Sequence, residues 1–319
     1  MKNKSVKTWA LVAAAGFAMV CVFAMASSLG SAVFSTGEIA ASPPPEESYA
    51  IIKIYGTIQD NTTGTARQGY DHNALIKYVD ELIEDEGNKG ILLDVDSPGG
   101  TVYHSDEMYL KLMEYKEKTK RPIHAYFRSV AASGGYYIAG GTADYVSANR
   151  NCWTGSIGVI ITATNLKGLY DKLGIQEVLI TSGANKGMGS QGSQLTDEQR
   201  AIYQGLVDES YNNFVDIVAK ARNLPIEKVK TIADGRVYTA TQAVENGLVD
   251  AVGTYQEAQD KMKELTGVEG YEKQMYVPTA LEKYFAKLQE MMPKSDVQAL
   301  SDSLSGELCG VPLYMYGIN

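Results

Sequence analysis

Histidine is scarce in this chain, and the catalytic and metal-binding patterns that depend on it are missing. The 319 residues include three histidines, His72, His104 and His124, and none of them lies in a run that looks prepared for catalysis. A Ser-His-Asp triad is therefore disfavoured. No CxxC, no HExxH and no cluster of histidine, cysteine and aspartate occurs, so we expect no metal site. Walker and dinucleotide fingerprints are absent too, and no cofactor is predicted.

Cysteine is equally scarce, and positive charge is in deficit. Beyond the N-terminal apolar segment only Cys152 and Cys309 remain; they can pair in an oxidising compartment, although nothing in their spacing demands it. The formal net charge is −9, from 29 lysines and arginines against 38 aspartates and glutamates. Neither nucleic acid nor an anionic lipid surface is therefore an expected partner.

The N-terminus combines three lysines within residues 1–7 with an uncharged stretch that follows them. An apolar run of this length predicts a transmembrane anchor at 8–30, with 1–7 as a cytoplasmic tail. A cleaved signal peptide is the alternative, because Ala-Met-Ala at 24–26 resembles a cleavage site. Residues 31–48 contain Pro-Pro-Pro-Glu-Glu and predict a stiff linker. We therefore expect a single-pass protein of the cell membrane whose folded part is extracytoplasmic.

Strand-like and helical patterns alternate after the linker, which indicates an α/β fold. The expected strands are 50–55, 91–95, 122–127, 144–148 and 176–180. The expected helices are 73–86, 104–118, 133–140, 164–173, 196–222, 226–233 and 239–247, and a closing strand or turn is expected at 248–253. About 270 residues follow the linker, enough for one large domain with a substantial core.

Three glycine-containing segments carry the candidate chemistry. Ser133 lies in Ala-Ala-Ser-Gly-Gly at 131–135, where small residues let backbone amides gather round a hydroxyl and present it as a nucleophile. Asp-Ser-Pro-Gly-Gly at 96–100 follows a buried strand as a turn whose glycines can direct their amides outward. Lys186 lies in Ser-Gly-Ala-Asn-Lys at 182–186, where loss of hydration can leave a lysine neutral and able to accept a proton. The structural alternatives are a tightly packed helix start and a solvated loop lysine.

Together with Thr-Gly-Ser-Ile-Gly-Val at 154–159, these segments resemble the bacterial signal peptide peptidase family, membrane-bound serine proteases also called protease IV. The separation of 53 positions between Ser133 and Lys186 also resembles that family. The resemblance implies the short, single-copy form and a Clp/crotonase-like fold with repeated ββα units, preceded by one N-terminal transmembrane helix. The expected domains are 1–7, 8–30, 31–48, a serine protease domain at 49–265, and 266–319 with a C-terminal helix and an apolar tail.

A Ser–Lys dyad needs a hydroxyl and a neutral amine within hydrogen-bond reach. In the predicted mechanism, Ser133 attacks a carbonyl while Lys186 takes its proton and later returns that proton to the leaving amine. The backbone amides of Gly134 and of Gly100 or Gly99 are expected to form the oxyanion hole. The sequence leaves open which of these last two amides faces inward.

Two further features have roles that the sequence leaves open. Ser182 precedes Lys186 by four residues and is a candidate either to orient its amine or to cap a local turn. Residues 309–317 are apolar, and we expect them to be extended. They are expected to lie in a groove or at a subunit contact, to be a self-processing substrate, or to form a terminus without a role.

The predicted function is that of a membrane-anchored serine endopeptidase. It would degrade signal peptide remnants and other extended apolar peptides at the extracytoplasmic membrane face. The resemblance implies a homo-oligomer whose subunits share active sites, because Ser133 and Lys186 lie on separate segments of a single-copy chain. An acyl-thioester enzyme of the crotonase type and a nonenzymatic scaffold of the same fold are the alternatives. Neither alternative requires both residues.

Overall fold

The computed structural model describes residues 45–60, 69–273 and 313–315. In this part of the chain the fold is α/β, as predicted, with one mixed sheet of nine strands. The strands are β1 (Ser48–Ile58), β2 (Asn88–Thr101), β3 (Ile123–Ala132), β4 (Tyr145–Ala148), β5 (Trp153–Gly155), β6 (Val237–Thr239), β7 (Ala251–Val252), β8 (Gly270–Tyr271) and β9 (Leu313–Met315). The helices are α2 (His72–Glu84), α3 (Val102–Thr119), α4 (Gly134–Thr142), α5 (Lys167–Leu173), α6 (Asp197–Ala221), α7 (Ile226–Ile232), α8 (Ala240–Glu245) and α9 (Tyr255–Thr266).

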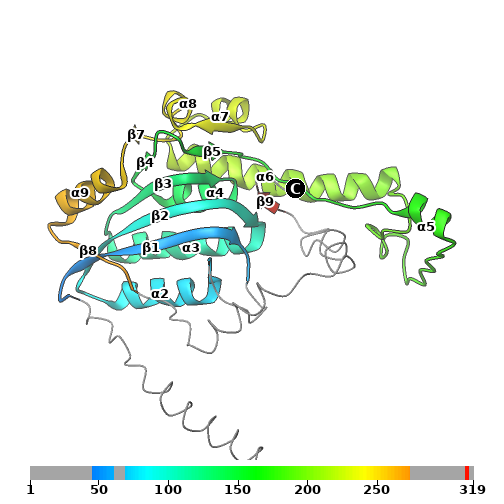
Figure 1. Cartoon of the computed structure of the whole chain (residues 1–319), viewed down its shortest axis with the longest axis horizontal. Coiled ribbons are helices and arrows are strands. Elements are labelled where there is room, and N and C mark those ends of the chain that lie inside the picture. Colours follow the sequence, from blue (N-terminus) through cyan, green and yellow to red (C-terminus); the bar gives the residue numbers. More distant parts are fainter. Residues whose placement is uncertain (1–44, 61–68, 274–312, 316–319) are drawn as a thin grey trace, which may run out of the picture.

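The sheet is mostly parallel, with β1, β2 and β3 at its centre (Figure 1). Along its main path the strand order is β6-β5-β3-β2-β1-β8, and β4 pairs with β3 and β7. Because the pairs β1–β2 and β2–β3 are parallel, each connection needs a crossover, and α2 and α3 provide these. The pairs β5–β6 and β2–β9 are antiparallel. The carboxyl ends of the central strands share one edge, which is where open α/β sheets form their ligand sites.

The central strands are packed on both faces, and two cores result. On one face Ile54, Leu93 and Phe127 are fully buried in a cluster that includes side chains of α2, α3, α4 and α6. On the other face a smaller cluster, which includes Leu92 and Met262, packs beneath α9. Burial on both faces is typical of parallel strands. The loops at the carboxyl ends of these strands therefore rest on a fixed base.

The predicted helices are confirmed to within three residues at either end, and four of the five predicted strands are present. Side-chain caps define several helix starts; the Thr101 side chain, for example, accepts the His104 amide at the start of α3. Helix α9 was missed, although the sequence holds its signals. Thr254 and Glu257 form a capping box, and Gly267 ends the helix in a left-handed conformation.

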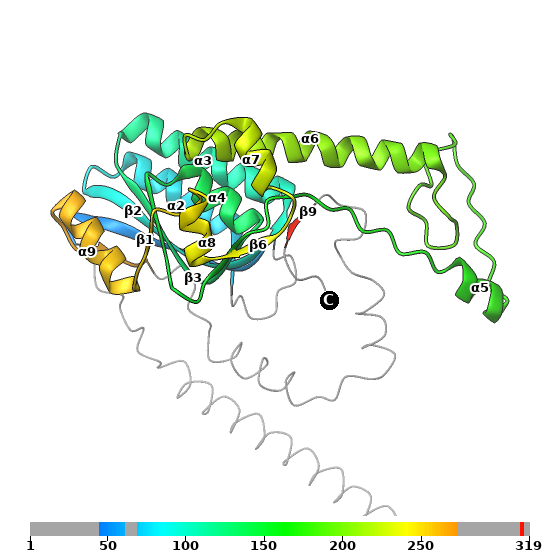
Figure 2. The same cartoon turned by 90° about the horizontal axis from the view of Figure 1, so that it is seen from above.

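The strand predicted at 176–180 is wrong, because the structure has no strand there. These residues belong to an arm, residues 160–196, that leaves the body, carries α5 and returns to the start of α6 (Figure 2). A strand needs a neighbour for its backbone hydrogen bonds, and no described strand pairs with this segment. Val178 and Ile180 are instead 77% and 95% exposed. The apolar run therefore lies uncovered in a single chain.

The expected turn at 96–100 is a second correction, because β2 runs through it to Thr101. Gly99 and Gly100 pair with Thr57 and Ile58 of β1, after a shift in the register of the two strands. Such a shift is a β-bulge, which absorbs an extra residue without ending the strand. Helix α3 then begins directly at Val102.

Several predictions concern residues beyond those described, namely 1–7, 8–30, most of 31–48, the C-terminal helix expected within 266–319, and Cys309. Among the helices of the described ranges, none combines the length and the apolar character needed to cross a membrane. The predicted protease domain at 49–265 is described except for residues 61–68. Within it Cys152 is a free, buried thiol whose pKa is raised to about 12 by burial.

Candidate active site

Ser133 occupies the single position between β3 and α4, at the carboxyl edge of the sheet. Its backbone is strained, with φ +51° and ψ −116°, a combination that side chains other than glycine rarely adopt. Two hydrogen bonds of 2.8 Å hold the turn: the Ser133 amide donates to the Gly155 carbonyl, and the Tyr137 amide donates to the Ser133 carbonyl. Strain that the surrounding structure maintains in this way is characteristic of functional sites.

The environment of the Ser133 hydroxyl is unusual for a buried polar group. The residue is 1% exposed, and its Oγ has no hydrogen-bond partner among the described residues. A buried hydroxyl without a partner costs about 1–3 kcal/mol relative to a satisfied one. Groups of this kind in native structures call for an explanation, and a catalytic role is one of those known. Both the backbone conformation of Ser133 and the environment of its hydroxyl therefore lower the stability of the fold.

The candidate oxyanion-hole glycines lie on two segments that the fold brings into contact. Gly134 and Gly135 open α4, where first-turn amides have no partner within the helix. Gly135 packs against β2 so closely that a Cβ there would lie 3.1 Å from the Ser97 carbonyl oxygen. Gly99 and Gly100 follow Ser97 in β2, and Gly99 has φ +103°. The residue that precedes Pro-Gly-Gly is therefore in contact with the first turn of α4, two positions after Ser133, and with β3, two positions before it.

Strand β9 lies beside this site. Its residues Leu313–Met315 pair antiparallel with Gly99–Thr101 of β2. The pairing of β3 with β2 ends at Ala131, so β9 occupies the side of β2 that β3 has left. An extended segment therefore adds to β2 next to the turn that carries Ser133 (Figure 1). Strand addition is one of the recurring ways in which proteins bind extended peptides.

Lys186 belongs to the arm of residues 160–196, which joins α6 at the end of that helix away from the body (Figure 2). The adjacent Asn185 amide group donates to the Glu198 carboxylate at 3.0 Å, in the first turn of α6. Helix α4 packs on the other half of α6, where Phe214 contacts it. Glu198 and Phe214 are 16 positions apart, which is about 24 Å along a helix. Within one chain the structure does not bring Ser133 and Lys186 together.

Ser182 lies on the same exposed part of the arm as Lys186. Among the hydrogen bonds of the described residues, none joins the two side chains. The local turn is held instead by the Lys186 amide, which donates to the Gly183 carbonyl at 3.1 Å. The proposed orienting contact from Ser182 is thus not made in a single chain.

All three histidines are engaged away from Ser133. The ring of His72 contacts the Tyr70 hydroxyl and the Glu107 carboxylate at 2.8 and 2.7 Å. His104 contacts the Thr101 hydroxyl at 2.6 Å, and His124 contacts the Ser147 hydroxyl at 3.0 Å. Burial lowers the pKa of His124 to about 4. The described hydrogen bonds therefore show no serine–histidine pair at the site.

An ion pair between a buried aspartate and a partly exposed arginine ties β2 to β3 just before the site. Asp94 is fully buried and accepts two hydrogen bonds from the Arg128 guanidinium, at 2.6 and 2.8 Å. The Tyr55 hydroxyl donates to the same carboxylate at 2.7 Å. Burial and this hydrogen bond raise the pKa of Tyr55, so the hydroxyl remains a donor at neutral pH. The Arg128 guanidinium also lies 4.5 Å from the centre of the Tyr255 ring, which packs α9 against the sheet.

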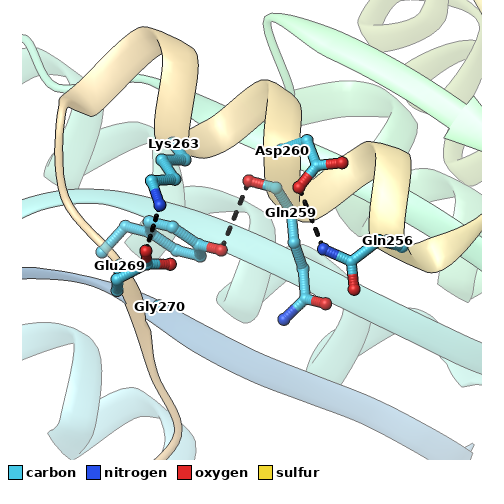
Figure 3. A pocket seen from close by; sticks show the side chains of 7 residues that line it. Gln256, Gln259, Asp260, Lys263, Glu269 and Gly270 are labelled. Carbon is cyan, nitrogen blue, oxygen red and sulfur yellow. Dashed lines mark hydrogen bonds and ion pairs between the residues drawn. The ribbon is translucent and has the colours of Figure 1, made fainter.

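A polar pocket of about 320 Å³ lies far from Ser133, where α9 meets β8 and the amino end of β1 (Figure 3). Its polar groups interact with one another: Lys263 pairs with Glu269, and the Gln256 amide donates to Asp260 at 2.9 Å. It contains none of the candidate site residues. The described part of the chain also holds no group of three or more histidine, cysteine or acidic side chains placed to bind a metal ion.

Comparison with known proteins places the chain among proteases. Residues 115–269 match the peptidase family S49. The chain is 41% identical to a putative signal peptide peptidase SppA of Enterococcus faecium, over 66% of this chain and 62% of that protein. It is 42% identical to a putative protease of Synechocystis sp., over 69% and 75%. It is 33% identical to Protease 4 of Haemophilus influenzae, over 68% of this chain but only 34% of that protein.

The α/β sheet, the strained serine and these similarities define the class of the protein, which is a serine protease. More specifically, the chain belongs to peptidase family S49. The matched region spans about two thirds or less of the Enterococcus and Haemophilus relatives.

Proposed function

We propose that this protein is a membrane-anchored serine endopeptidase with Ser133 as its nucleophile. The observation that carries the proposal is the state of Ser133, which is strained, buried and without a hydrogen-bond partner among the described residues. Its substrates are signal peptide remnants and other extended apolar peptides. Two facts support this substrate class: an extended segment, β9, pairs with β2 beside Ser133, and the Enterococcus relative is named a putative signal peptide peptidase.

In the proposed chemistry, the Ser133 hydroxyl attacks the scissile carbonyl and a tetrahedral intermediate forms. Amides of Gly134 and of Gly100 or Gly99 stabilise the negative oxygen. The amine of Lys186 accepts the proton from Ser133 and passes it to the departing peptide amine. Water then attacks the acyl-enzyme, with Lys186 as the base a second time, and Ser133 is regenerated.

Lys186 must come from a neighbouring subunit, because the arm holds it away from Ser133 of its own chain. We therefore propose a homo-oligomer with shared active sites, as the family resemblance implies. The arm supports this, because it exposes apolar side chains that a single chain leaves uncovered; Leu173, Val178 and Ile180 are 63%, 77% and 95% exposed. A second copy that covers this surface also removes water from Lys186, which favours the neutral amine that a base requires.

The remaining features of the proposal concern fold and location. The parallel βα units at the centre of the sheet are compatible with the Clp/crotonase-like fold and its ββα repeats. The transmembrane anchor at 8–30 would place the protease domain at the extracytoplasmic face of the cell membrane, which suits substrates that remain in the bilayer.

The test is peptide hydrolysis by the full chain in detergent micelles, with a leucine-rich peptide that resembles a signal sequence. Ser133→Ala and Lys186→Ala should each abolish turnover. A mixture of the two inactive variants, unfolded together and refolded, should regain activity, because some sites then combine an intact serine with an intact lysine. Lys172→Ala is the matched control, since Lys172 is another exposed lysine of the same arm, and it should retain activity.

Each contrary result has a distinct meaning. Full activity in Lys186→Ala would show that another group is the base. Activity in a strictly monomeric chain would refute the shared site. An assembled parent protein that hydrolyses no peptide would refute the protease, and the crotonase-type enzyme or the scaffold would then be tested with acyl-thioesters.

A further inference from the structure

Strand β2 contains a bulge just before its two glycines. The register of β1 and β2 passes from Tyr55 opposite Asp96 to Thr57 opposite Gly99. Strand β2 therefore uses three residues where β1 uses two, and the extra length falls at Ser97 and Pro98. Proline has no amide hydrogen to donate to a ladder. A bulge of this kind leaves backbone groups without their regular partners.

The Ser97 hydroxyl takes the place of the missing ladder bonds. Its Oγ donates to the Gly56 carbonyl at 2.6 Å and accepts from the Gly99 amide at 3.1 Å. The residue is fully buried, so water does not compete for these contacts. A hydroxyl has one proton, which is directed to Gly56, and its oxygen then draws the Gly99 amide back toward Ser97.

Ser97 also touches the segment that carries the nucleophile. It pairs with Ala131 of β3, two residues before Ser133. A Cβ on Gly135 would lie 3.1 Å from the Ser97 carbonyl oxygen and 3.3 Å from the Ser97 Cβ. Strand β2 and helix α4 are therefore closely packed at this point. Ser97 thus joins β1, the glycines of β2 and the first turn of α4 at one point.

We propose that Ser97 is the positioning residue of the oxyanion hole. Its hydroxyl engages the amide of Gly99, and the amide of Gly100 is thereby the β2 donor that acts with Gly134 on the oxygen of the tetrahedral intermediate. Ser97 itself touches no reacting atom. The proposal rests on the proposed function and decides between the two adjacent glycines that the sequence left open.

Replacement of Ser97 by alanine removes the hydroxyl and nearly preserves the volume. The Gly99 amide and the Gly56 carbonyl lose their partner, and the backbone of the bulge relaxes. Loss of a whole oxyanion donor lowers kcat by roughly 10²–10³. Loss of its alignment should lower kcat by about ten- to a hundredfold, with KM within about threefold, because the donor acts in the transition state.

The experiment compares the full chain with Ser97→Ala and with Ser147→Ala as the matched control. Ser147 is also a buried serine of the same sheet, and its hydroxyl contacts only the His124 ring among the described hydrogen bonds. Both changes remove one buried hydroxyl, but only Ser97 is joined to the glycine segment. Ser147→Ala should keep kcat within about twofold of the parent. Equal losses of kcat in the two variants would overturn the proposal.

A second measurement separates positioning from general stability. A peptide aldehyde forms a tetrahedral adduct with the nucleophile and so needs the oxyanion hole, whereas the matching peptide amide binds without it. Ser97→Ala should weaken aldehyde binding by the same factor as kcat/KM and leave amide binding unchanged. Equal weakening of both ligands would contradict the assignment. If the alanine variant does not fold, Ser97→Cys is used to measure the ratio of aldehyde affinity to amide affinity. A ratio equal to that of the parent protein would overturn the proposal as well.

The parent and Ser133→Ala proteins distinguish a failure of this inference from a failure of the proposed function. A parent that does not cleave peptides refutes the function itself. A parent that cleaves, a Ser133→Ala protein that does not, and a Ser97→Ala protein that behaves like Ser147→Ala refute only the role of Ser97.

Discussion

The backbone strain at Ser133 predicts that the nucleophile destabilises its own fold. Ser133 has φ +51° and ψ −116°, and its buried Oγ has no partner in the described part of the chain. Ser133→Ala removes the unsatisfied hydroxyl and keeps the strain, while Ser133→Gly removes both. The series Ser, Ala, Gly should therefore rise in stability, contrary to the usual order in which glycine is the least stable.

The expected change in the free energy of unfolding at each substitution follows from the interaction that the substitution removes. Loss of an unsatisfied buried hydroxyl should raise the free energy of unfolding by about 1 kcal/mol. A residue held in a sparsely populated backbone region costs about 1–3 kcal/mol. Glycine also lowers the free energy of unfolding by about 0.5–1 kcal/mol, because it raises the conformational entropy of the unfolded chain. At the middle of these two ranges, Ser133→Gly should be about 1 kcal/mol more stable than Ser133→Ala, and both should be inactive.

Urea unfolding followed by circular dichroism measures these differences, at one protein concentration because assembly affects the apparent stability. Ala139→Gly is the control. It lies in the same short helix and is fully buried, with no positive φ, and the change should cost about 1 kcal/mol. A Ser133→Gly protein no more stable than Ser133→Ala would refute the strain argument.

Three further predictions follow from the same structure. Arg128→Leu leaves the buried carboxylate of Asp94 with the Tyr55 hydroxyl as its remaining described partner, and should lower the free energy of unfolding by about 3 kcal/mol in urea; a loss below about 1 kcal/mol would contradict the pairing. His124 has its pKa lowered to about 4 by burial, so the unfolded chain binds a proton near pH 6.5 that the folded chain binds only near pH 4. Stability should fall by up to about 3 kcal/mol as pH drops through this window, and His124→Gln should remove that part of the dependence; an unchanged pH profile would refute it. Deletion of residues 313–319 vacates the edge of β2 beside Ser133 and should lower KM for peptides severalfold at constant kcat, whereas an unchanged KM would show that β9 does not compete with substrate.

The parts of the fold that sequence patterns predicted well are those set by local rules. The apolar runs at 91–95 and 122–127 form central strands, because residues of this kind are buried on both faces of a parallel sheet. Helix boundaries agree closely, because caps and glycine stops act over a few residues. The same kind of local cue, Thr254 with Glu257, marks the start of α9, a helix that is absent from the expected elements.

The errors arose where a segment depends on distant partners. The run at 176–180 has the composition of a strand but no neighbouring strand, so its side chains stay exposed on the arm. Pro-Gly-Gly has the composition of a turn, yet pairing with β1 keeps it in β2 as a bulged extension. Ser97 was missed as well, although its place before Pro-Gly-Gly was visible, because its contacts come from β1 and α4.

The sequence by itself determined the chemical groups of the site and the local shape of the nucleophile turn, since small residues and glycines permit the backbone that Ser133 requires. Only the tertiary structure decided how those groups are arranged. It paired Ser97 with Gly56 and Gly99, laid β9 against β2, and held Lys186 away from Ser133 of the same chain. The physical reason is the sequence separation over which each interaction acts. Side-chain periodicity and helix caps involve residues a few positions apart, whereas strand register and helix packing depend on segments far apart in the chain.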